Sequence, residues 1–331
     1  MAVPGMYGDI KLISGRSCPE LAQEISDRLC DTCEESVPLL PRDIYNFKND
    51  NIYVRLGRSV RGQDVYIIQT MARPVSESIM ELLITLDAVR RDSAGRITAV
   101  FPYMAYTRSD KKDEPRVAIT ARLIADLIET AGADRYITLD LHSPQIQGFF
   151  KIPGDVLSTF GLLTKAVRER IPLDNLTVTA VDLGFAKECR NWGRALGGAP
   201  VAFIEKKRNG ESVQAMSLVG TVEGRDVLLV DDEVDTGGSI EQAVYTLREY
   251  GARNIYLAFM HPVFSAGAVE RLSRLSLKHI VFANTLPITK EQRLPNMTIV
   301  SVAALLGEVI RRAHLGLSVG EMDKDLIGDF N

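Results

Sequence analysis

The chain has 331 residues, of which 46% are hydrophobic and 25% are charged, with a formal net charge of -4. This is the composition of a globular protein, and the length suits two domains of roughly 150 residues. The mildly acidic charge gives no reason to expect an electrostatic nucleic-acid binder. No apolar run reaches the roughly 20 residues of a membrane span, and the N-terminus lacks the basic and apolar regions of a secretion signal. We therefore expect a soluble, cytoplasmic protein.

Apolar, β-branched runs alternate with segments of helical period along the chain, a pattern typical of a parallel sheet covered by helices. The expected strands are 64–69, 97–101, 135–141, 176–181, 201–205, 226–232 and 254–260. The segment 119–132 predicts a helix that ends at Gly132, a typical C-cap residue. The apolar residues expected on one face of this helix are Ile119, Leu123, Ile124, Leu127 and Ile128. The fold class is α/β.

Two long segments, 61–101 and 223–259, resemble each other. Each contains a Gly-x-Asp turn, a strand, a loop, a helix that begins at a serine, a Gly-containing turn and a second strand. This similarity predicts two tandem copies of one domain. We place them at 1–155 and 156–331, each with a mostly parallel sheet flanked by helices. Gln69 and Thr70 stand where the second copy has a pair of aspartates, so only the second copy is expected to have kept the chemistry.

Charged side chains follow four of the expected strands, at the edge where open parallel sheets bind ligands. His142 follows strand 135–141, and Asp182 follows strand 176–181. Lys206 and Arg208 follow strand 201–205, and an acidic, glycine-rich stretch follows the apolar run that ends at Val230. One such end alone could be a solvated strand terminus. Four together favour a shared site.

The acidic, glycine-rich stretch leads into a predicted helix. Its two glycines let backbone N–H groups approach an anion at the helix N-terminus, and its two hydroxyl side chains add donors. We predict a phosphomonoester pocket here. The two adjacent aspartates just before it can accept hydrogen bonds from ribose hydroxyls or hold a hydrated Mg²⁺. The candidate substrate-binding residues are Asp231, Asp232, Asp235, Thr236, Gly237, Gly238 and Ser239.

Lys206 and Arg208 supply the opposite charge. Phosphoryl transfer needs such cations because its catalysis consists mainly of positioning the reactants and neutralising negative charge on the transferred group. No GxxxxGK[ST] segment occurs in the chain, so a P-loop is not expected to hold the donor nucleotide. Cys30 and Cys33 have redox or zinc spacing, but no second pair or nearby histidine completes a site. We interpret these cysteines as incidental thiols.

The chain resembles the ribose-phosphate diphosphokinase family over almost its whole length. The resemblance rests on "DLHSPQIQGFF" (140–150), "YTRSDKKD" (106–113), "GRDVLLVDDEVDTGGS" (224–239) and "HPVFS" (261–265). It implies two phosphoribosyltransferase-type domains, the first with ATP-contacting loops and the second with the ribose 5-phosphate site. It also implies Mg²⁺-dependent transfer of the diphosphoryl group of ATP to the C1 hydroxyl of ribose 5-phosphate, and a homo-oligomer built as a hexamer of dimers.

The resemblance also implies residue roles. His142 and Asp182 match the family's metal positions, and Lys206 and Arg208 would stabilise the transferring group from a mobile loop. The implied ATP-binding residues are Phe47, Asn49, Asn51, Arg108, Ser109, Asp110, Lys111 and His142.

Three segments depart from the family pattern. Asn49 and Asn51 stand where the adenine-recognition segment usually has carboxylates, so this segment gains N–H donors. Ser109 stands where glutamine is usual. In the diphosphate loop, Phe185 replaces a glycine and Glu188 stands where a basic residue is common. If the backbone needs a positive φ there, a non-glycine residue costs about 1–2 kcal/mol.

Three functions therefore stay open. The first is a synthetase that acts on ATP and ribose 5-phosphate. The second is the same chemistry with another donor nucleotide, or with a ribose 5-phosphate derivative such as ADP-ribose. The third is a catalytically silent regulatory subunit, against which the presence of Lys206, Arg208, His142 and Asp182 argues.

Overall fold

The structure of the chain is a computed structural model that describes residues 7–32, 36–181, 183–209, 212–265 and 267–322. The chain divides into two compact units. The first contains the described residues up to Ser158, Thr285–Pro287 and the residues from Ser301 on; the second contains Thr159–Asn284 and Ile288–Val300. The change of unit after Ser158 is close to the predicted boundary at 155. The segment from Ser301 on differs from the prediction, because it belongs to the first unit.

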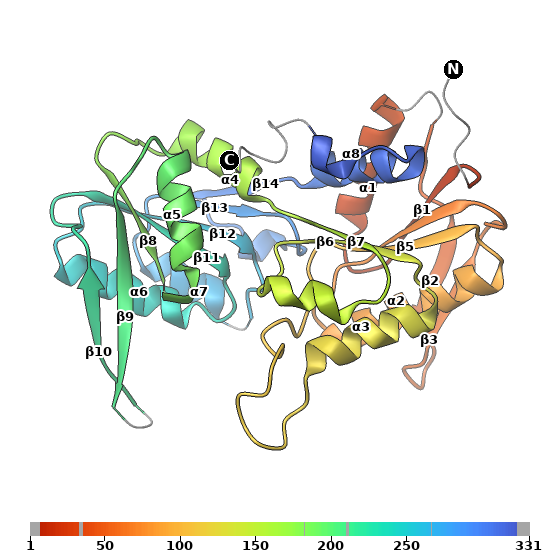
Figure 1. Ribbon diagram of the computed structural model, residues 1–331, viewed down its shortest axis with the longest axis horizontal. Helices are drawn as coiled ribbons and strands as arrows, with labels where there is room; N and C mark the ends of the chain where they lie inside the picture. The colour runs from red at the N-terminus through yellow and green to blue at the C-terminus, as the bar shows by residue number, and fades with distance from the viewer. Residues whose placement is uncertain (1–6, 33–35, 182, 210–211, 266, 323–331) are drawn as a thin grey trace. The chain divides into compact units, whose positions relative to one another are not determined.

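The first unit is built around a parallel sheet with the order β1-β4-β5-β6-β7. Its strands are β1 (Ile10–Ser14), β4 (Asp64–Ile68), β5 (Arg96–Phe101), β6 (Arg135–Leu139) and β7 (Gly154–Leu157), and neighbours pair in parallel. Helices α2 (Val75–Arg91) and α3 (Thr120–Ala131) lie on one side of this sheet, and α1 (Pro19–Thr32) and α8 (Ala303–Leu315) lie on the other (Figure 1). The interior strand β4 is therefore buried on both faces, which explains why its residues 65–68 are all apolar or aromatic.

A separate antiparallel pair also belongs to the first unit. It consists of β2 (Arg42–Asn46) and β3 (Ile52–Leu56), and β3 packs against α2. The short 3₁₀ helices of this unit are η1 (Pro144–Phe149) and η4 (Val319–Glu321).

The second unit has a sheet with the order β10-β9-β8-β11-β12-β13-β14. All neighbours pair in parallel except β10 and β9, which are antiparallel. The strands are β8 (Leu176–Ala180), β9 (Val201–Asn209), β10 (Ser212–Val219), β11 (Asp226–Glu233), β12 (Ile255–His261), β13 (Ile280–Ala283) and β14 (Met297–Val300).

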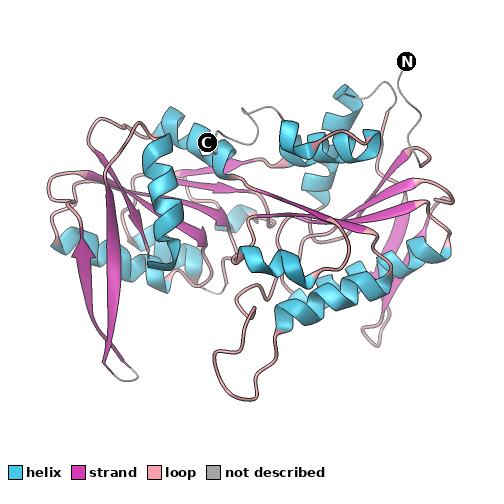
Figure 2. Ribbon diagram, viewed as in Figure 1, coloured by secondary structure: helices cyan, strands magenta, loops and turns pink. Residues whose placement is uncertain are grey.

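Helices cover both faces of this second sheet as well (Figure 2). The helix α4 packs on β12 to β14, and α5 packs on β8 and β9. Apolar residues of α6 and α7 form one buried cluster with residues of β11, β12 and β13. The helices are α4 (Phe160–Arg170), α5 (Ala186–Ala195), α6 (Gly238–Glu249) and α7 (Ala268–Arg274), with η2 (Leu183–Phe185) and η3 (Lys290–Gln292) as 3₁₀ turns.

The two sheets repeat one arrangement. The parallel order β1-β4-β5-β6-β7 of the first unit corresponds to β8-β11-β12-β13-β14 of the second, and in both copies an antiparallel pair follows the first strand along the chain. The predicted α/β fold class, with two related parallel sheets flanked by helices, is confirmed. None of the helices in the described part of the chain combines the length and the apolar character that crossing a membrane requires.

The helix predicted at 119–132 is present as α3. Gly132 ends it in the left-handed region, with a φ of 117°, and its N–H donates to the carbonyl of Glu129. The predicted apolar face is only partly buried, because Leu123 and Leu127 are 52% and 37% exposed.

Candidate active site

Asp231 and Asp232 lie at the carboxyl end of β11, where the sequence predicted a ligand. Both are half-buried. The N–H of Asp232 donates to the Oδ1 of Asp231 at 3.0 Å, and the N–H of Glu233 donates to the Oδ1 of Asp232 at 2.8 Å. These bonds from backbone donors, together with partial access to water, explain how two adjacent carboxylates are tolerated at the end of a buried strand.

The predicted phosphate loop connects β11 to α6. Gly237 precedes the first residue of α6 and has a φ of 76°, which favours glycine. The N–H of Gly238 donates to the hydroxyl oxygen of Thr236 at 3.4 Å, and the side chains of Thr236 and Ser239 are exposed. The loop therefore places hydroxyl groups beside the N-terminus of a helix of 12 residues. Backbone N–H groups and hydroxyls at a helix N-terminus are groups that can bind a phosphate.

The segment after β12 holds the phosphate loop in place. The Ser265 hydroxyl donates to a carboxylate oxygen of Asp235, and the Ser265 N–H donates to the Asp235 carbonyl at 3.1 Å. The N–H of Phe264 donates to the carbonyl of Val234 at 2.9 Å. Sequence reasoning used "HPVFS" only as a family motif and missed this supporting role. The adjacency of β11 and β12 in a parallel sheet, whose carboxyl ends lie at one edge, could have indicated it.

Asp182 lies outside the described residues, as do the side chains of Lys206 and Arg208. The backbone at Lys206 and Arg208 belongs to β9, which continues to Asn209 and pairs with β10. The sequence predicted a loop after residue 205; the structure corrects this to a strand, because the chain turns back and supplies an antiparallel partner. Phe185 has a φ of -92°, so the cost of a non-glycine residue at positive φ does not arise there.

The predicted ATP residues lie in the first unit, in three of its connections. Arg108 and Lys111 are exposed in the connection between β5 and α3, where Asp110 is half-buried. Ser109 is held there, since its N–H donates to the carbonyl of Tyr106 at 2.9 Å and its own carbonyl accepts from Ala121 at 3.3 Å.

His142 is exposed between β6 and η1, after a residue with unusual backbone geometry. Asp140 has a φ of 38°, a region that is sterically costly for a non-glycine residue. Its carboxylate accepts a hydrogen bond from the Ser158 hydroxyl at 2.7 Å, and its N–H donates to Leu157 at 2.9 Å. These contacts fix the backbone from which the His142 loop starts. Nothing in the sequence indicated this strained backbone at Asp140. Such strain often marks a functional loop.

Phe47, Asn49 and Asn51 form the turn between β2 and β3. The N–H of Phe47 donates to the Asn51 carbonyl at 2.9 Å, and the N–H of Asn51 donates to the Asn49 Oδ1 at 3.3 Å. The Phe47 ring is 47% exposed and lies 5.4 Å from the ring of Tyr45 and 5.6 Å from that of Tyr53, measured between centroids. Sequence reasoning named Phe47 but missed the two tyrosines, which give this turn an aromatic surface suited to stacking on a flat ring.

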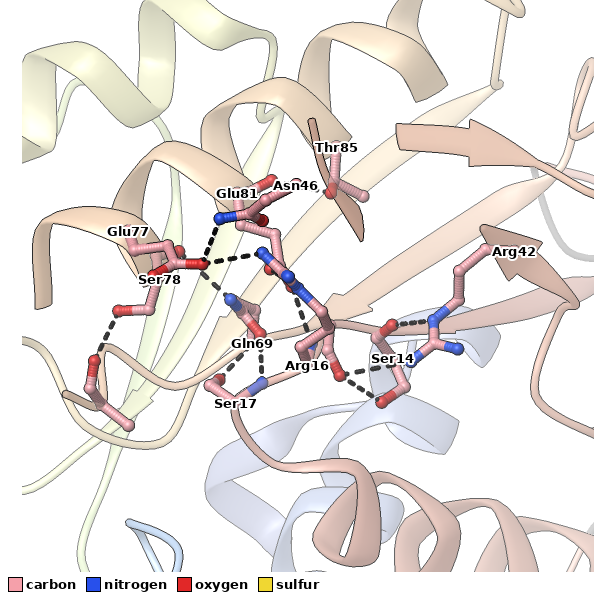
Figure 3. Close-up of polar contacts among 12 residues, drawn as sticks. Ser14, Arg16, Ser17, Arg42, Asn46, Gln69, Glu77, Ser78, Glu81 and Thr85 are labelled. Atoms are coloured by element: carbon pink, nitrogen blue, oxygen red, sulfur yellow. Dashed lines mark hydrogen bonds and ion pairs between the residues drawn. The ribbon is translucent and has the colours of Figure 1, made fainter. Parts of the chain in front are cut away.

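The corresponding strand end of the first unit carries different chemistry (Figure 3). Gln69, at the position of Asp231, is 1% exposed. Its Oε1 accepts from the Ser17 hydroxyl at 2.7 Å, and its Nε2 donates to the Ser78 carbonyl at 3.2 Å. Arg16 donates to Glu81 at 2.5 Å and to Glu77 at 3.1 Å around a cavity of about 190 Å³. An internally satisfied polar network thus occupies the place where the second copy has its acidic pair.

The predicted residues therefore lie in two groups, one in each unit. The phosphate loop and its acidic pair belong to the second unit; Arg108 to Lys111, His142 and the β2–β3 turn belong to the first. Among the described residues, no group of three or more His, Cys, Asp or Glu side chains forms a metal cluster. Mg²⁺ commonly uses only one or two carboxylates together with phosphate oxygens and water. The hard oxygen donors of Asp231 and Asp232 fit that requirement.

Comparisons with known proteins identify the family of the chain. The family described as the N-terminal domain of ribose phosphate pyrophosphokinase matches residues 10–132, and the phosphoribosyl synthetase-associated domain matches residues 202–324. A ribose-phosphate pyrophosphokinase of Mycobacterium leprae is 43% identical over 306 residues, which cover 92% of each chain. The chain belongs to the ribose-phosphate pyrophosphokinase family.

Other family members give the same result. A ribose-phosphate pyrophosphokinase of Clostridium acetobutylicum is 43% identical over 95% of this chain and 97% of its own. The crystal structure of phosphoribosylpyrophosphate synthetase from Mycobacterium smegmatis superposes with a TM-score of 0.87 at 40% identity, over 92% of this chain and 98% of that one. The family predicted from the motifs is confirmed, as is the prediction that the chain is an enzyme of the diphosphotransferase class.

Proposed function

We propose that this member of the ribose-phosphate pyrophosphokinase family transfers the diphosphoryl group of ATP to the C1 hydroxyl of ribose 5-phosphate. The products are 5-phosphoribosyl 1-diphosphate and AMP, made in the cytoplasm for nucleotide biosynthesis. One observation carries the proposal: an acidic pair at the end of β11 lies directly before a glycine-containing loop at the N-terminus of α6. A ligand that fits both features has vicinal hydroxyls and a phosphomonoester.

The loop and the acidic pair would bind different ends of ribose 5-phosphate. The N–H groups of Gly237 and Gly238 and the hydroxyls of Thr236 and Ser239 donate to the 5-phosphate. The carboxylates of the acidic pair are acceptors when ionised, so they accept hydrogen bonds from the ribose hydroxyls. The sugar is thereby fixed at both ends, which limits the positions available to its C1 hydroxyl.

Charge neutralisation is the second requirement of the reaction. Mg²⁺, when bound, would neutralise phosphate oxygens. In the second unit Asp231 or Asp232 would hold it, and Asp182 and His142 stay predicted metal ligands. Lys206 and Arg208 are proposed to stabilise negative charge on the transferring group, and Arg108 to contact the ATP phosphates. Ser109, Asp110 and Lys111 complete the proposed ATP-binding connection.

The β2–β3 turn is proposed to bind the base of the donor nucleotide. The exposed ring of Phe47, which lies beside the rings of Tyr45 and Tyr53, offers a surface for stacking. We further propose that the enzyme is a homo-oligomer, in which this turn serves the active site of a neighbouring subunit.

One observation favours a donor other than ATP as the second candidate. The Oδ1 of Asn49 accepts a hydrogen bond from the N–H of Asn51 within the turn. That bond occupies one of the two lone pairs of the oxygen, and the N–H₂ group adds two donors that a carboxylate lacks. A base that presents ring carbonyls would match this turn better than the amino group of adenine.

A product analysis tests the proposal. The purified protein is incubated with Mg²⁺, ribose 5-phosphate and each nucleoside triphosphate in turn, and nucleoside mono- and diphosphates are separated. AMP from ATP supports the proposed reaction, and a monophosphate formed mainly from another nucleotide supports the second candidate. A nucleoside diphosphate indicates an ordinary kinase. Absence of turnover with every nucleotide contradicts both proposals and favours a silent subunit.

A further inference from the structure

Arg271, on α7, contacts the phosphate loop from outside the motif that defines it. Its Nη1 donates to the carbonyl oxygen of Thr236 at 2.7 Å, and its Nε lies 3.1 Å from the Oε2 of Glu241. Glu241 is in the first turn of α6, and its N–H donates to the carbonyl of Gly237. A single guanidinium therefore joins a carbonyl of the loop to the helix that the loop begins.

The bond to the Thr236 carbonyl determines where the next N–H group points. A trans peptide unit is planar, with its C=O and its following N–H on opposite sides. Because Arg271 holds the carbonyl of Thr236 on the side of α7, the N–H of Gly237 points to the other side. The loop conformation that presents this donor to an anion is thus set by a residue that need not contact the anion.

The positive charge of Arg271 also favours an anion at the loop. Its Nη1 lies 3.7 Å from the place that a Cβ atom at Gly238 would occupy. A cation beside a helix N-terminus adds to the positive potential of the helix dipole and so favours a bound anion. Glu241 limits this effect by pairing with the guanidinium, and at the same time fixes the orientation of the guanidinium.

A contribution to folding stability does not by itself account for the pair of Arg271 and Glu241. The side chains of Arg271 and Glu241 are 37% and 32% exposed, and ion pairs with this much access to water contribute little to folding. Arg274 offers a comparison on the same helix: it pairs with Glu270, and both are mostly exposed, at 71% and 67%. Arg271 differs from Arg274 in its additional bond to the loop carbonyl.

We propose that Arg271 is a positioning residue for the 5-phosphate of the substrate, with Glu241 as the group that orients it. The proposal rests on the proposed function, because it takes the loop at 235–239 as the phosphate site. It extends that function by assigning phosphate affinity in part to α7, a helix outside the phosphate motif.

Steady-state kinetics of Arg271→Met test the proposal, with Arg274→Met as the matched control. The KM for ribose 5-phosphate should rise about tenfold or more, the size expected for losing a charge-assisted hydrogen bond. The KM for ATP and kcat should change less than twofold. Arg271→Lys should recover part of the affinity, because an ammonium can still donate to the Thr236 carbonyl, and Glu241→Gln should give a smaller rise. An unchanged KM for ribose 5-phosphate, or an equal loss in all three parameters, would overturn the proposal.

Hydrogen exchange separates this proposal from the proposed function. In the ligand-free protein, the peptide that covers residues 234–242 should exchange faster in Arg271→Met than in the wild type or in Arg274→Met. Adding ribose 5-phosphate alone should protect this peptide in the wild type, and should do so at higher concentration in Arg271→Met. If the wild type shows neither turnover nor protection, the proposed function fails. The ligand-free comparison still decides whether Arg271 positions the loop, and equal exchange in the three proteins would show that it does not.

Discussion

Arg16 and Glu81 form an ion pair that joins the loop after β1 to the helix α2, with 2.5 Å between the Arg16 Nε and the Glu81 Oε2 (Figure 3). The Glu81 side chain is only 2% exposed. The backbone N–H of Arg16 donates to the other oxygen of the same carboxylate at 2.6 Å. A buried carboxylate is thus neutralised by one residue, in the first unit's counterpart of the acidic, phosphate-loop region.

Removing the Arg16 guanidinium should destabilise the first unit. In Arg16→Met the Glu81 carboxylate stays buried and keeps only its backbone donor. We expect a loss of about 2 kcal/mol in the free energy of unfolding, typical of a lost hydrogen bond to a charged group. Urea denaturation at one fixed protein concentration measures it. Arg91→Met is the control, because the pair of Arg91 and Asp87 is 77% and 50% exposed and should matter by less than about 0.5 kcal/mol. Equal losses in the two variants would contradict this account.

Asp64 gives the first unit a contribution to stability that depends on pH. Burial acts to raise the pKa of this carboxyl, but hydrogen bonds from His314 and Arg96 outweigh it, so the pKa lies below its ordinary value. The stabilisation is therefore complete above the unfolded pKa of about 3.9 and is lost as the pH falls through that value toward the folded pKa. The Arg96 guanidinium bonds Asp64 at 2.8 Å and 2.6 Å and also donates to the carbonyl of Ala313 on α8.

Asp64→Asn tests this dependence. The variant should be less stable than the wild type by about 3 kcal/mol near pH 7, because Arg96 loses a buried partner. The difference in unfolding midpoint should stay nearly constant down to about pH 4.5 and should shrink as the pH falls below about 3.9. Asp87→Asn, at an exposed pair, serves as the control and should show little effect at any pH. A difference for Asp64→Asn that does not change with pH would contradict the assigned role.

Gly237 should matter for substrate binding beyond its effect on stability. Gly237→Ala places a Cβ at a φ of 76° without any close contact, since the nearest heavy atom is 3.7 Å away. Its cost is therefore backbone strain of about 1–2 kcal/mol. Gly198 is a matched control, with a φ of 78° and nothing within 4 Å of the added Cβ. Both variants should lose similar stability. Only Gly237→Ala should raise the KM for ribose 5-phosphate, by about tenfold. Equal KM values in the two variants would show that the loop is not part of the substrate site.

Lys206 should affect turnover more than substrate affinity. Lys206→Ala should lower kcat by about 10²-fold or more, because a cation that stabilises the transferring group acts mainly in the transition state. The dissociation constant of ribose 5-phosphate, measured by calorimetry without nucleotide, should change less than threefold. The exposed Lys278→Ala variant is the control for removing a surface charge. A large loss of ribose 5-phosphate affinity in Lys206→Ala would count against a transition-state role.

The strand pattern could be predicted from the sequence because the strands are buried on both faces. Val65 to Ile68 in β4 are fully buried. A strand that is covered on both faces needs apolar side chains at successive positions, so the run is visible in the sequence. The face of α3 was harder to predict. Leu123 and Leu127 share the helical period of the buried residues but lie 52% and 37% exposed. Periodicity identifies an apolar stripe, and the contacts made by the folded chain decide how much of it is covered.

No local sequence pattern indicates that α8 belongs to the first unit. This helix packs against α1, far earlier in the sequence, and a contact of this kind depends on the tertiary fold alone. The extension of β9 to Asn209 was missed for a similar reason, because its pairing with β10 makes charged residues part of a strand.

The candidate site, too, could be predicted from the sequence only in part. The rule that ligands bind beyond the carboxyl ends of parallel strands led to the loop at 235–239 and its acidic pair as a candidate site. The residues that hold the loop, Ser265 and Arg271, come from the segment after a neighbouring strand. Arg271 carries no sequence signature of its own, and the motif that contains Ser265 does not by itself show that this residue contacts the loop.

The most direct test of the central claim follows the β-phosphorus of the donor. The wild-type protein is incubated with Mg²⁺, ribose 5-phosphate and ATP labelled with ³²P at the β position, and the products are separated. Diphosphoryl transfer predicts that the label moves to the sugar product while unlabelled AMP is released. Label that remains in ADP would show transfer of the γ-phosphoryl group alone and would contradict the account.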